Sequence, residues 1–368
     1  MAMDISRRTF LGGATALAAS GCATRAPLAR YVAPGEIKAL LLHLGHNMWC
    51  DWFPADIDIE AIAKDYQKGR SPVPDTELRS KDDLWRKATD HAAARGLNMI
   101  VIDLGEGLVY PSHPELSIKG SWSPEKIRSE IVRLNALGLE VIPKLNFSTT
   151  HNGWLKQYRR MLSTPTYYKV CEDIIADVAE IFNRPRFLHI GFDEETAVHQ
   201  DNSKRCLYIS VRKGEFWWYD FLHIVRTVEK NGMRAWTWSD YGWDHPDFYT
   251  RCPKSVLMSN WYYDESYGGF ELAENKTACH KRLKGFYDLD KAGFEQVPCG
   301  TNWSGWKRRR LNIGADDVIG KLVKLCRRDI SKANLKGFMM APWASCDTQE
   351  HLDFNIKGID LFADALKA

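Results

Sequence analysis

The sequence lacks the features that mark several common protein classes. No two of its nine cysteines are separated by only two residues, so a zinc ribbon or a redox-active Cys-x-x-Cys pair is not supported. A net charge of +3 is too small to favour nucleic acid as a partner. After the N-terminal region, no apolar run is long enough to cross a membrane. The 45% of apolar residues is ordinary for a globular protein.

The N-terminal residues resemble an export signal. Ser6-Arg7-Arg8-Thr9-Phe10-Leu11 is typical of a twin-arginine motif, and the apolar segment 11–19 is too short to span a bilayer. Ala19-Ser20-Gly21-Cys22 resembles a lipobox, in which cleavage before Cys22 leaves a lipidated cysteine, although Ala19 replaces the usual leucine. We expect a signal peptide and tether over residues 1–35 and a catalytic domain over 36–368. The protein is then periplasmic or at the cell surface, with membrane attachment through Cys22.

Short apolar segments alternate with longer amphipathic segments along the rest of the chain. The apolar segments predict strands at 37–44, 99–103, 140–145, 187–191, 234–238, 256–261, 296–301 and 337–341. The amphipathic segments predict helices at 81–95, 123–138, 164–183, 216–229, 279–292, 315–328 and 349–366. Eight strand–helix units favour an α/β fold of the (β/α)₈ TIM barrel type. A doubly wound open sheet is the alternative, but residues 45–49 form no glycine-rich phosphate turn after the first strand.

The segment 187–195 is the most informative part of the chain. It is a short apolar run that ends in Asp193 and Glu194, where the predicted strand leaves the core. Burying unpaired charges costs several kcal/mol, so the two acids are expected to face a solvated pocket. Paired carboxylates at the carboxyl end of a strand are what acid-catalysed cleavage of a glycoside needs. A surface loop that opens with acidic residues is the alternative interpretation.

Other polar and aromatic residues follow the predicted strands at the same end. In a barrel, functional residues gather there. Half of the 14 tryptophans lie at these strand ends. Aromatic faces stack on the C–H faces of sugar rings, while carboxylates and amides bond the hydroxyls, so the mixture predicts a carbohydrate site. The candidate binding residues are His43, Asp103, Asn146, His151, Trp238, Asp240, Trp261, Tyr262, Trp303 and Trp343.

Four segments carry a resemblance to a known family. His189-Ile190-Gly191-Phe192-Asp193-Glu194 resembles the His-x-Gly-x-Asp-Glu motif of glycoside hydrolase family 20, the β-N-acetylhexosaminidases. The segment 139–144 with His151 is similar to that family's third strand, and 236–240 is similar to its fifth. Trp261-Tyr262-Tyr263-Asp264 resembles most the hexosaminidase D-like branch.

The resemblance implies an exported glycoside hydrolase that removes terminal N-acetylhexosamine residues from a glycan by substrate-assisted, retaining catalysis. Asp193 would orient the 2-acetamido group, whose oxygen attacks the anomeric carbon, and Glu194 would be the general acid and base. No cofactor and no metal is implied. Unequal burial of two adjacent acids predicts that one is charged and the other protonated.

The seventh predicted strand supports substrate assistance. Many retaining barrels place a nucleophilic glutamate at the end of this strand. Here the strand is followed by Thr301-Asn302-Trp303-Ser304, without a carboxylate, and Glu295 stands at its opposite end. The chain also departs from the family: it has no arginine after the first strand, and it has Ser345 where an acid often follows the tryptophan of strand eight. The usual tyrosine after strand seven is missing as well, and Tyr262 or Tyr263 could substitute for it.

Two other functions stay open at this point. One is a degenerate barrel that binds carbohydrate without cleaving it, against which the Asp193–Glu194 pair argues. The other is a metal-dependent hydrolase that uses His43, His46, His189 and Asp193, because imidazoles and a carboxylate can form a zinc site. Spacing by three along a strand places His43 and His46 on different faces, and a histidine within a strand such as His189 is more often a hydrogen-bonded core residue.

Overall fold

The strands form a barrel. The computed structural model describes residues 30–52, 74–202, 208–263, 278–302 and 318–368. Within them, eight parallel strands form one sheet in the order β6-β5-β4-β3-β2-β1-β8-β7. Bridges between Met258 and Gln296 and between Trp261 and Cys299 join the two outer strands, so the sheet closes almost completely. The predicted (β/α)₈ fold is confirmed. The strands are β1 (Ile37–His43), β2 (Met99–Asp103), β3 (Glu140–Lys144), β4 (Phe187–His189), β5 (Arg234–Trp238), β6 (Leu257–Ser259), β7 (Cys299–Gly300) and β8 (Gly337–Met340).

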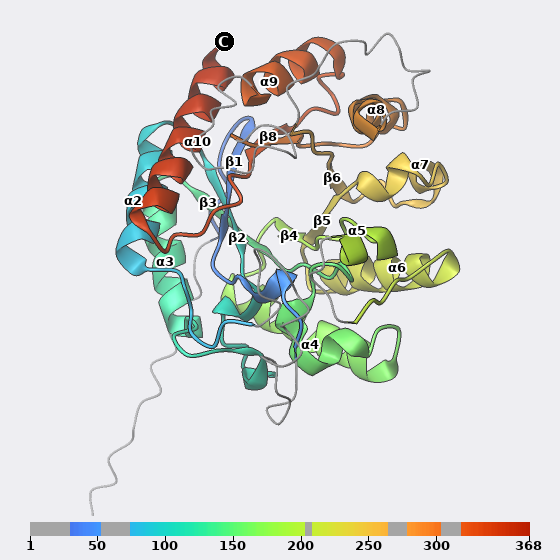
Figure 1. Ribbon diagram of the computed structural model, residues 1–368. Helices are drawn as coiled ribbons and strands as arrows, with labels where there is room; N and C mark the ends of the chain where they lie inside the picture. Colours follow the sequence, from blue (N-terminus) through green and yellow to red (C-terminus); the bar gives the residue numbers. More distant parts are fainter. Residues whose placement is uncertain (1–29, 53–73, 203–207, 264–277, 303–317) are drawn as a thin grey trace, which may run out of the picture.

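Helices surround the strands (Figure 1). They are α2 (Asp82–Ala94), α3 (Pro124–Ala136), α4 (Pro165–Ile181), α5 (Ala197–Asn202), α6 (Glu215–Lys230), α7 (Phe248–Arg251), α8 (Ala278–Lys291), α9 (Val318–Asp329) and α10 (Gln349–Lys367). The predicted helices are confirmed within a few residues at each end, whereas α5 was not predicted. Ser123 and Thr164 cap α3 and α4, since their side chains accept hydrogen bonds from the backbone N–H groups of Lys126 and Tyr167.

The apolar core has two layers, because successive side chains of a strand point to opposite faces. On β1, Leu40 and Leu42 belong to the layer between the barrel and the helices, whereas Ala39 and Leu41 belong to the layer inside the barrel. Both layers are fully packed with buried side chains, as in other barrels of this type. The inner layer consists of Ile37, Ala39, Leu41, Met99, Val101, Ile142, Phe187, Trp236, Trp238, Leu257, Trp261, Tyr263, Val297, Cys299, Met339 and Ala341.

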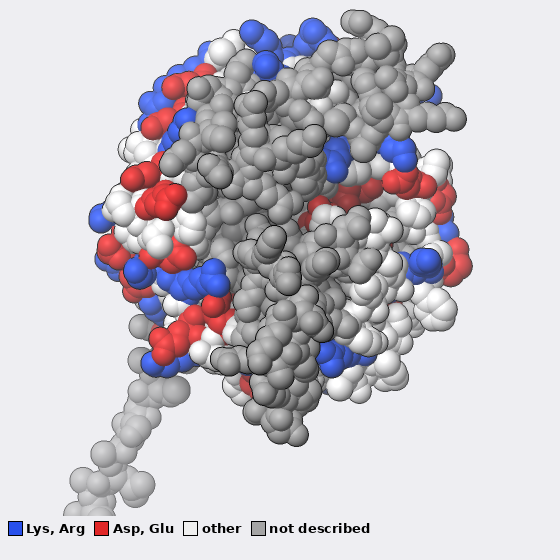
Figure 2. Space-filling view, viewed as in Figure 1, with Lys and Arg blue, Asp and Glu red and all other residues white. Residues whose placement is uncertain are grey.

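Ion pairs tie the helical shell together at its surface. The Arg95 guanidinium at the end of α2 lies 2.7 Å from Asp360 and 2.6 Å from Asp364, both on α10. Figure 2 shows basic and acidic side chains interspersed over the described part of this face, rather than gathered by sign. Among the residues that the structure describes, no helix has the length and apolar character needed to cross a bilayer.

Candidate active site

A polar layer lies above the apolar interior, at the carboxyl ends of β1, β2 and β3. His43 Nδ1 lies 3.3 Å from Asp103 Oδ2, and the ammonium group of Lys144 contacts the same oxygen. All three side chains are buried. Burial by itself would raise the pKa of Asp103, but the charge of Lys144 and the contact with His43 hold it below its ordinary value. Asp103 was predicted to bind sugar. In the structure its carboxylate contacts His43 and Lys144, and binding of sugar by Asp103 stays a prediction.

The backbone after β4 turns in an unusual conformation. Gly191, Phe192 and Glu194 have φ angles of 74°, 67° and 56°. Residues other than glycine rarely adopt this left-handed region. Each one costs about 1–3 kcal/mol and persists only where its surroundings hold it in place. A Cβ atom at position 191 would stand 2.0 Å from Asn146 Oδ1. The turn therefore needs glycine at position 191. The two strained non-glycine residues, Phe192 and Glu194, lie on either side of Asp193 in the chain.

Gly191→Ala is expected to destabilise the protein by several kcal/mol. The matched control is Gly96→Ala, since Gly96 has a φ of 84° with open space around its Cβ position. The control experiences only the left-handed strain, about 1–2 kcal/mol, whereas Gly191→Ala adds the overlap with Asn146. Urea denaturation measures the free energies of unfolding, and equal losses in the two variants would contradict the close packing at the turn.

The loop after β3 holds the acidic segment residue by residue. Asn146 Nδ2 donates to Asp193 Oδ1 at 2.9 Å, and the Ser148 hydroxyl donates to the Asp193 carbonyl oxygen. The Thr150 hydroxyl donates to the Glu194 carbonyl oxygen at 2.6 Å. Asn146 was predicted to bind substrate, which stays a prediction, and in the structure its amide bonds Asp193. These bonds hold the Asp193 carboxylate and the backbone of Asp193 and Glu194.

A buried network behind the loop anchors the next acid, Glu195. The Thr149 N–H donates to Glu195 Oε1 at 3.0 Å. The Arg212 guanidinium donates to Glu195, to Asp220 Oδ2 at 3.1 Å and to the Phe147 carbonyl oxygen at 2.8 Å. The Glu195, Arg212 and Asp220 side chains are at most 2% exposed. Glu195 therefore serves the scaffold, and sequence reasoning gave no role to Arg212.

Arg212→Ala is expected to lower the free energy of unfolding by about 3–5 kcal/mol, because it leaves two buried carboxylates without their partner. The control is Lys87→Ala, which removes an exposed ion pair of 3.6 Å with Asp83 on α2. Such a pair contributes about 0–1 kcal/mol. Chemical denaturation of both variants tests the difference, and a loss for Arg212→Ala as small as that of the control would contradict a structural role for the network.

One imidazole links the two central acids. His151 Nδ1 lies 3.2 Å from Asp193 Oδ1, and its Nε2 lies 3.3 Å from Glu194 Oε2. Burial alone would lower the pKa of His151, but Asp193 and Glu194 outweigh it and raise that pKa to about 9. Burial would raise the pKa of both acids, yet His151 holds the pKa of Asp193 below its usual value, and His151 with His199 does the same for Glu194. These shifts favour the protonated form of His151 and the charged form of both acids, whereas the sequence predicted one protonated acid.

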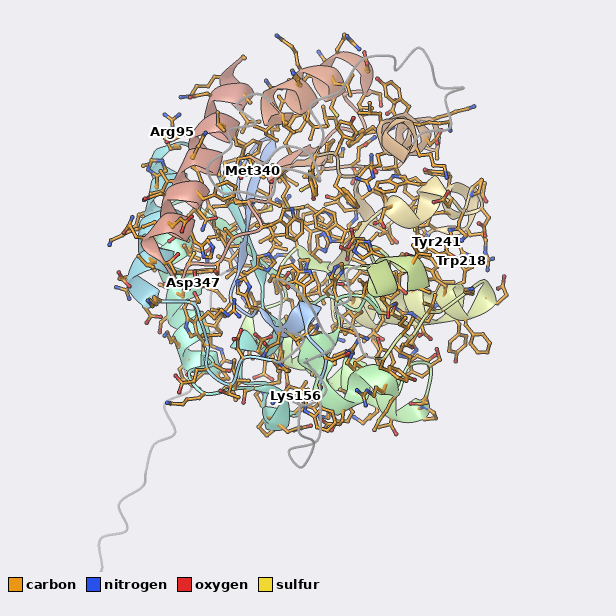
Figure 3. All side chains as sticks on the ribbon, viewed as in Figure 1. Arg95, Lys156, Trp218, Tyr241, Met340 and Asp347 are labelled. Atoms are coloured by element: carbon orange, nitrogen blue, oxygen red, sulfur yellow. The ribbon has the colours of Figure 1, made fainter. Side chains whose placement is uncertain are left out.

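Asp240 is the acid of the site whose pKa is raised. Its Oδ2 accepts a hydrogen bond from the Glu194 N–H at 2.8 Å. Burial raises the pKa of Asp240, and the charge of Asp193 adds to this, to about 8. The next residue, Tyr241, stacks on Trp217 with ring centroids 3.6 Å apart and lies edge-on to Trp218 at 6.2 Å. Figure 3 shows Tyr241 beside Trp218 of α6, so this packing holds the backbone of Asp240 in place.

Aromatic rings continue the inner layer up to the site. Trp261 and Tyr263 stack with centroids 5.0 Å apart, and Trp343 lies 6.3 Å from Tyr263 and 6.0 Å from Trp238. The prediction for Tyr262 needs correction, because its fully buried side chain belongs to the layer between the barrel and the helices. Successive side chains of a strand point to opposite faces, so Tyr263 lies on the inner face of the barrel in place of Tyr262.

Three further predictions concern His43, Trp303 and Glu295. The ring of His43 lies 5.2 Å from Trp49 and 5.5 Å from Trp343, measured between centroids, so the end of β1 joins the aromatic group. The prediction for Trp303 falls outside the described residues. Glu295 lies 2.5 Å from Arg234 and 2.7 Å from Lys336, both of which begin or precede a strand at the opposite end of the barrel. Glu295 is therefore remote from the acidic pair, as predicted.

A histidine that the sequence did not point to completes the site. His199 on α5 places its Nε2 2.6 Å from Glu194 Oε2. His151, Glu194 and His199 each offer one donor atom within 4.8 Å of the others. The alternative metal set of His43, His46, His189 and Asp193, considered for a metal-dependent hydrolase, is not such a group among the described residues. His189 is a core residue whose Nδ1 accepts a hydrogen bond from the Gly191 N–H at 3.2 Å.

No family model matches the sequence, and no curated protein matches it either. The fold is similar to that of solved β-N-acetylhexosaminidases. A Bacteroides fragilis β-N-acetylhexosaminidase matches with a TM-score of 0.57 and 12% identity, over 88% of this chain and 66% of that one. A Streptomyces plicatus N-acetyl-β-hexosaminidase in complex with Thio-NAglucal matches with a TM-score of 0.55 and 12% identity, over 90% and 64%.

A third structure, a Vibrio harveyi GH20 exo-β-N-acetylglucosaminidase in complex with N-acetylglucosamine, matches with a TM-score of 0.51 and 13% identity, over 91% of this chain and 56% of that one. The chain spans less than two thirds of the length of these three proteins. Likeness at such identity establishes the fold, while function has to be argued from the site.

Proposed function

We propose that this protein is a glycoside hydrolase that removes terminal N-acetylhexosamine residues from a glycan by substrate-assisted, retaining catalysis. The observation that carries the proposal is the arrangement of Asp193, His151 and Glu194. Two acids on one strained turn contact opposite nitrogens of a single imidazole, at the barrel end where active sites lie. The fold that this chain shares with known β-N-acetylhexosaminidases supports the same assignment.

Glu194 is the proposed general acid and base. The His151–Glu194 pair holds one proton between Nε2 and Oε2, which are 3.3 Å apart. When the glycosidic oxygen approaches Glu194, that proton passes to the oxygen as the bond from the anomeric carbon to the oxygen breaks. Water later attacks the anomeric carbon, the bond from that carbon to the acetamido oxygen breaks, and the water gives one proton to Glu194. The side chain is 16% exposed, which leaves room for contact with a ligand.

Asp193 is the proposed partner of the substrate's acetamido group. As the acetamido oxygen attacks the anomeric carbon, the nitrogen gains positive charge, and a fixed carboxylate stabilises it. Asn146 and His151 fix the carboxylate of Asp193 in one direction. The raised pKa of Asp240 favours its neutral form, which leaves the negative charge of the acidic group mainly on Asp193 and Glu194.

The aromatic residues are the proposed sugar platform. Trp238, Trp261, Tyr263 and Trp343 contact one another at three strand ends, and Trp261 Nε1 donates to Asp240 Oδ1 at 3.5 Å. Aromatic faces pack well on the apolar faces of sugar rings. The segment 261–264 is also the basis of a finer proposal, that the enzyme is closest to the hexosaminidase D-like branch.

Comparison of two aryl glycosides tests the proposed reaction. The enzyme is expected to release the aryl alcohol from an aryl N-acetyl-β-glucosaminide and to leave the matching aryl β-glucoside, which has no acetamido group, essentially intact. Equal rates on both substrates would contradict substrate assistance. Binding of N-acetylglucosamine without hydrolysis of either substrate would favour the degenerate barrel, and loss of hydrolysis with a chelator would favour a metal-dependent hydrolase.

The N-terminal residues support a further proposal, that the protein is exported by the twin-arginine pathway and attached to the membrane through lipidated Cys22. Paired arginines ahead of a short apolar segment are typical of such signals. Cell fractionation of the parent and of a variant with Arg7→Lys and Arg8→Lys tests the route, and export of the double variant at the parental level would contradict it.

A further inference from the structure

The proposed reaction assigns no proton transfer to His199, yet its imidazole contacts the general acid Glu194. Its Nε2 lies 2.6 Å from Glu194 Oε2, and His151 Nε2 approaches the same oxygen at 3.3 Å from another element. Two imidazole nitrogens and one carboxylate oxygen therefore converge. Among the residues that the structure describes, this is the one group of histidine, cysteine and acidic side chains whose donor atoms come together in this way.

The spacing of the three donor atoms suits a transition-metal ion. They all lie within 4.8 Å of one another. A tetrahedral zinc ion bound at about 2.0–2.1 Å by nitrogen and oxygen needs its ligands about 3.3 Å apart. Side-chain rotations that move the donor atoms by roughly an ångström are enough to reach that geometry. Two imidazoles with a carboxylate favour zinc and its neighbours over magnesium and calcium, which prefer oxygen ligands.

The surroundings of the three ligands also match a metal site. Asp193 Oδ1 lies 3.2 Å from His151 Nδ1, on the side of the ring opposite to the Nε2 atom that faces Glu194. An acid behind a ligating histidine is the usual way in which proteins orient such a ligand. On α5, the Gln200 side chain donates to Thr149 Oγ1 at 3.2 Å and to the Ser210 carbonyl oxygen at 2.7 Å, which fixes the helix that carries His199. The His199 side chain is 29% exposed, so an ion can enter from that side.

We propose that His151, Glu194 and His199 form a binding site for Zn²⁺ or a similar divalent transition-metal ion, and that the bound ion inhibits the enzyme. The inhibition rests on the proposed function, because the ion takes the Glu194 oxygen that would carry the proton. Asp193, behind His151, would then hold a ligand in place instead of the acetamido group. The site itself does not depend on which substrate the enzyme cleaves.

Metal titration of the purified protein tests the site without reference to activity. The chelator-treated protein is titrated with Zn²⁺ by calorimetry and with Co²⁺ by visible absorption, in which tetrahedral coordination gives intense bands. We expect one equivalent to bind, Mg²⁺ not to compete, and His199→Gln to weaken binding at least about tenfold. His113→Gln is the matched control, since His113 contacts Glu115 and Asp173 away from the site. It should bind like the parent.

A parallel assay on the aryl N-acetyl-β-glucosaminide tests the inhibition. Each variant is compared with and without Zn²⁺, so that any change in its basal rate cancels. Saturating Zn²⁺ should lower the parental rate about a hundredfold, as expected from loss of the general acid, and His199→Gln should need at least about ten times more zinc.

The two readouts separate the possible failures. If the parent protein bound no equivalent of Zn²⁺ tightly, the proposed site would be overturned. It would also be overturned if His199→Gln bound Zn²⁺ as tightly as the parent, as expected when cysteine thiols hold the ion. Binding with unchanged or increased hydrolysis would overturn the inhibitory role. Metal binding in a protein that hydrolyses neither substrate would reject the proposed function while supporting the site.

Discussion

Glu194→Gln is expected to lower kcat for an aryl N-acetyl-β-glucosaminide with a poor leaving group by at least about a hundredfold. Glutamine keeps the size of the side chain but cannot pass a proton between His151 and the glycosidic oxygen. Binding of the sugar depends on the aromatic residues and on Asp193, so KM should change little. Steady-state kinetics across a series of leaving groups measures the effect.

The leaving-group series also shows which step is lost. An activated aryl alcohol leaves with little protonation, so the rate of the first step, cleavage of the glycosidic bond, should recover in Glu194→Gln. Azide should restore the second step, attack on the intermediate, because azide needs no base. Glu295→Gln is the matched control, since Glu295 is engaged with Arg234 and Lys336 at the other end of the barrel. Near-parental turnover by Glu194→Gln, or a comparable loss in Glu295→Gln, would contradict the assigned roles.

Asp193→Asn is expected to lower turnover by about a hundred- to a thousandfold, as does the removal of other preorganised groups that stabilise charge in a transition state. The amide cannot balance the positive charge that develops on the acetamido nitrogen. The variant keeps the size of the side chain, and with it the packing of the turn after β4.

The two acid variants are expected to respond differently to the leaving group. Asp193 acts on the nucleophile that the substrate supplies, so an activated leaving group should restore little of the activity in Asp193→Asn. Measuring both variants on one series of aryl glycosides separates the roles. Full recovery of Asp193→Asn with an activated leaving group would show that Asp193 assists departure rather than attack.

The sequence was sufficient for the architecture because the signals are local. Apolar runs of strand length, separated by amphipathic segments with Ser123-Pro124 and Thr164-Pro165 at helix starts, predicted the order and type of the elements. The barrel rule then placed Asp193, Glu194 and His151 at one end. The choice between Tyr262 and Tyr263 could also have been made by counting alternation from Leu257 on β6, which gives Tyr263 to the interior.

The rest of the site depends on contacts between distant segments, which no local pattern contains. The pairing of Lys144 with Asp103 arises because β2 and β3 align these residues in register. Arg212 meets Glu195 only after the loops beyond β3 and β4 have packed, and the helix that brings His199 to Glu194 is too short for a periodic signal. The raised pKa of His151 likewise follows from its distances to Asp193 and Glu194 rather than from residue types.

The central claim is that Asp193 and Glu194 act on a substrate that supplies its own nucleophile. The most direct measurement is calorimetric binding of the thiazoline analogue of the cyclic intermediate, compared with N-acetylglucosamine. Such an analogue should bind at least about a hundredfold more tightly than the sugar, and Asp193→Asn should lose most of that advantage. Equal affinity for the two compounds, or an advantage unaffected by Asp193→Asn, would contradict the claim.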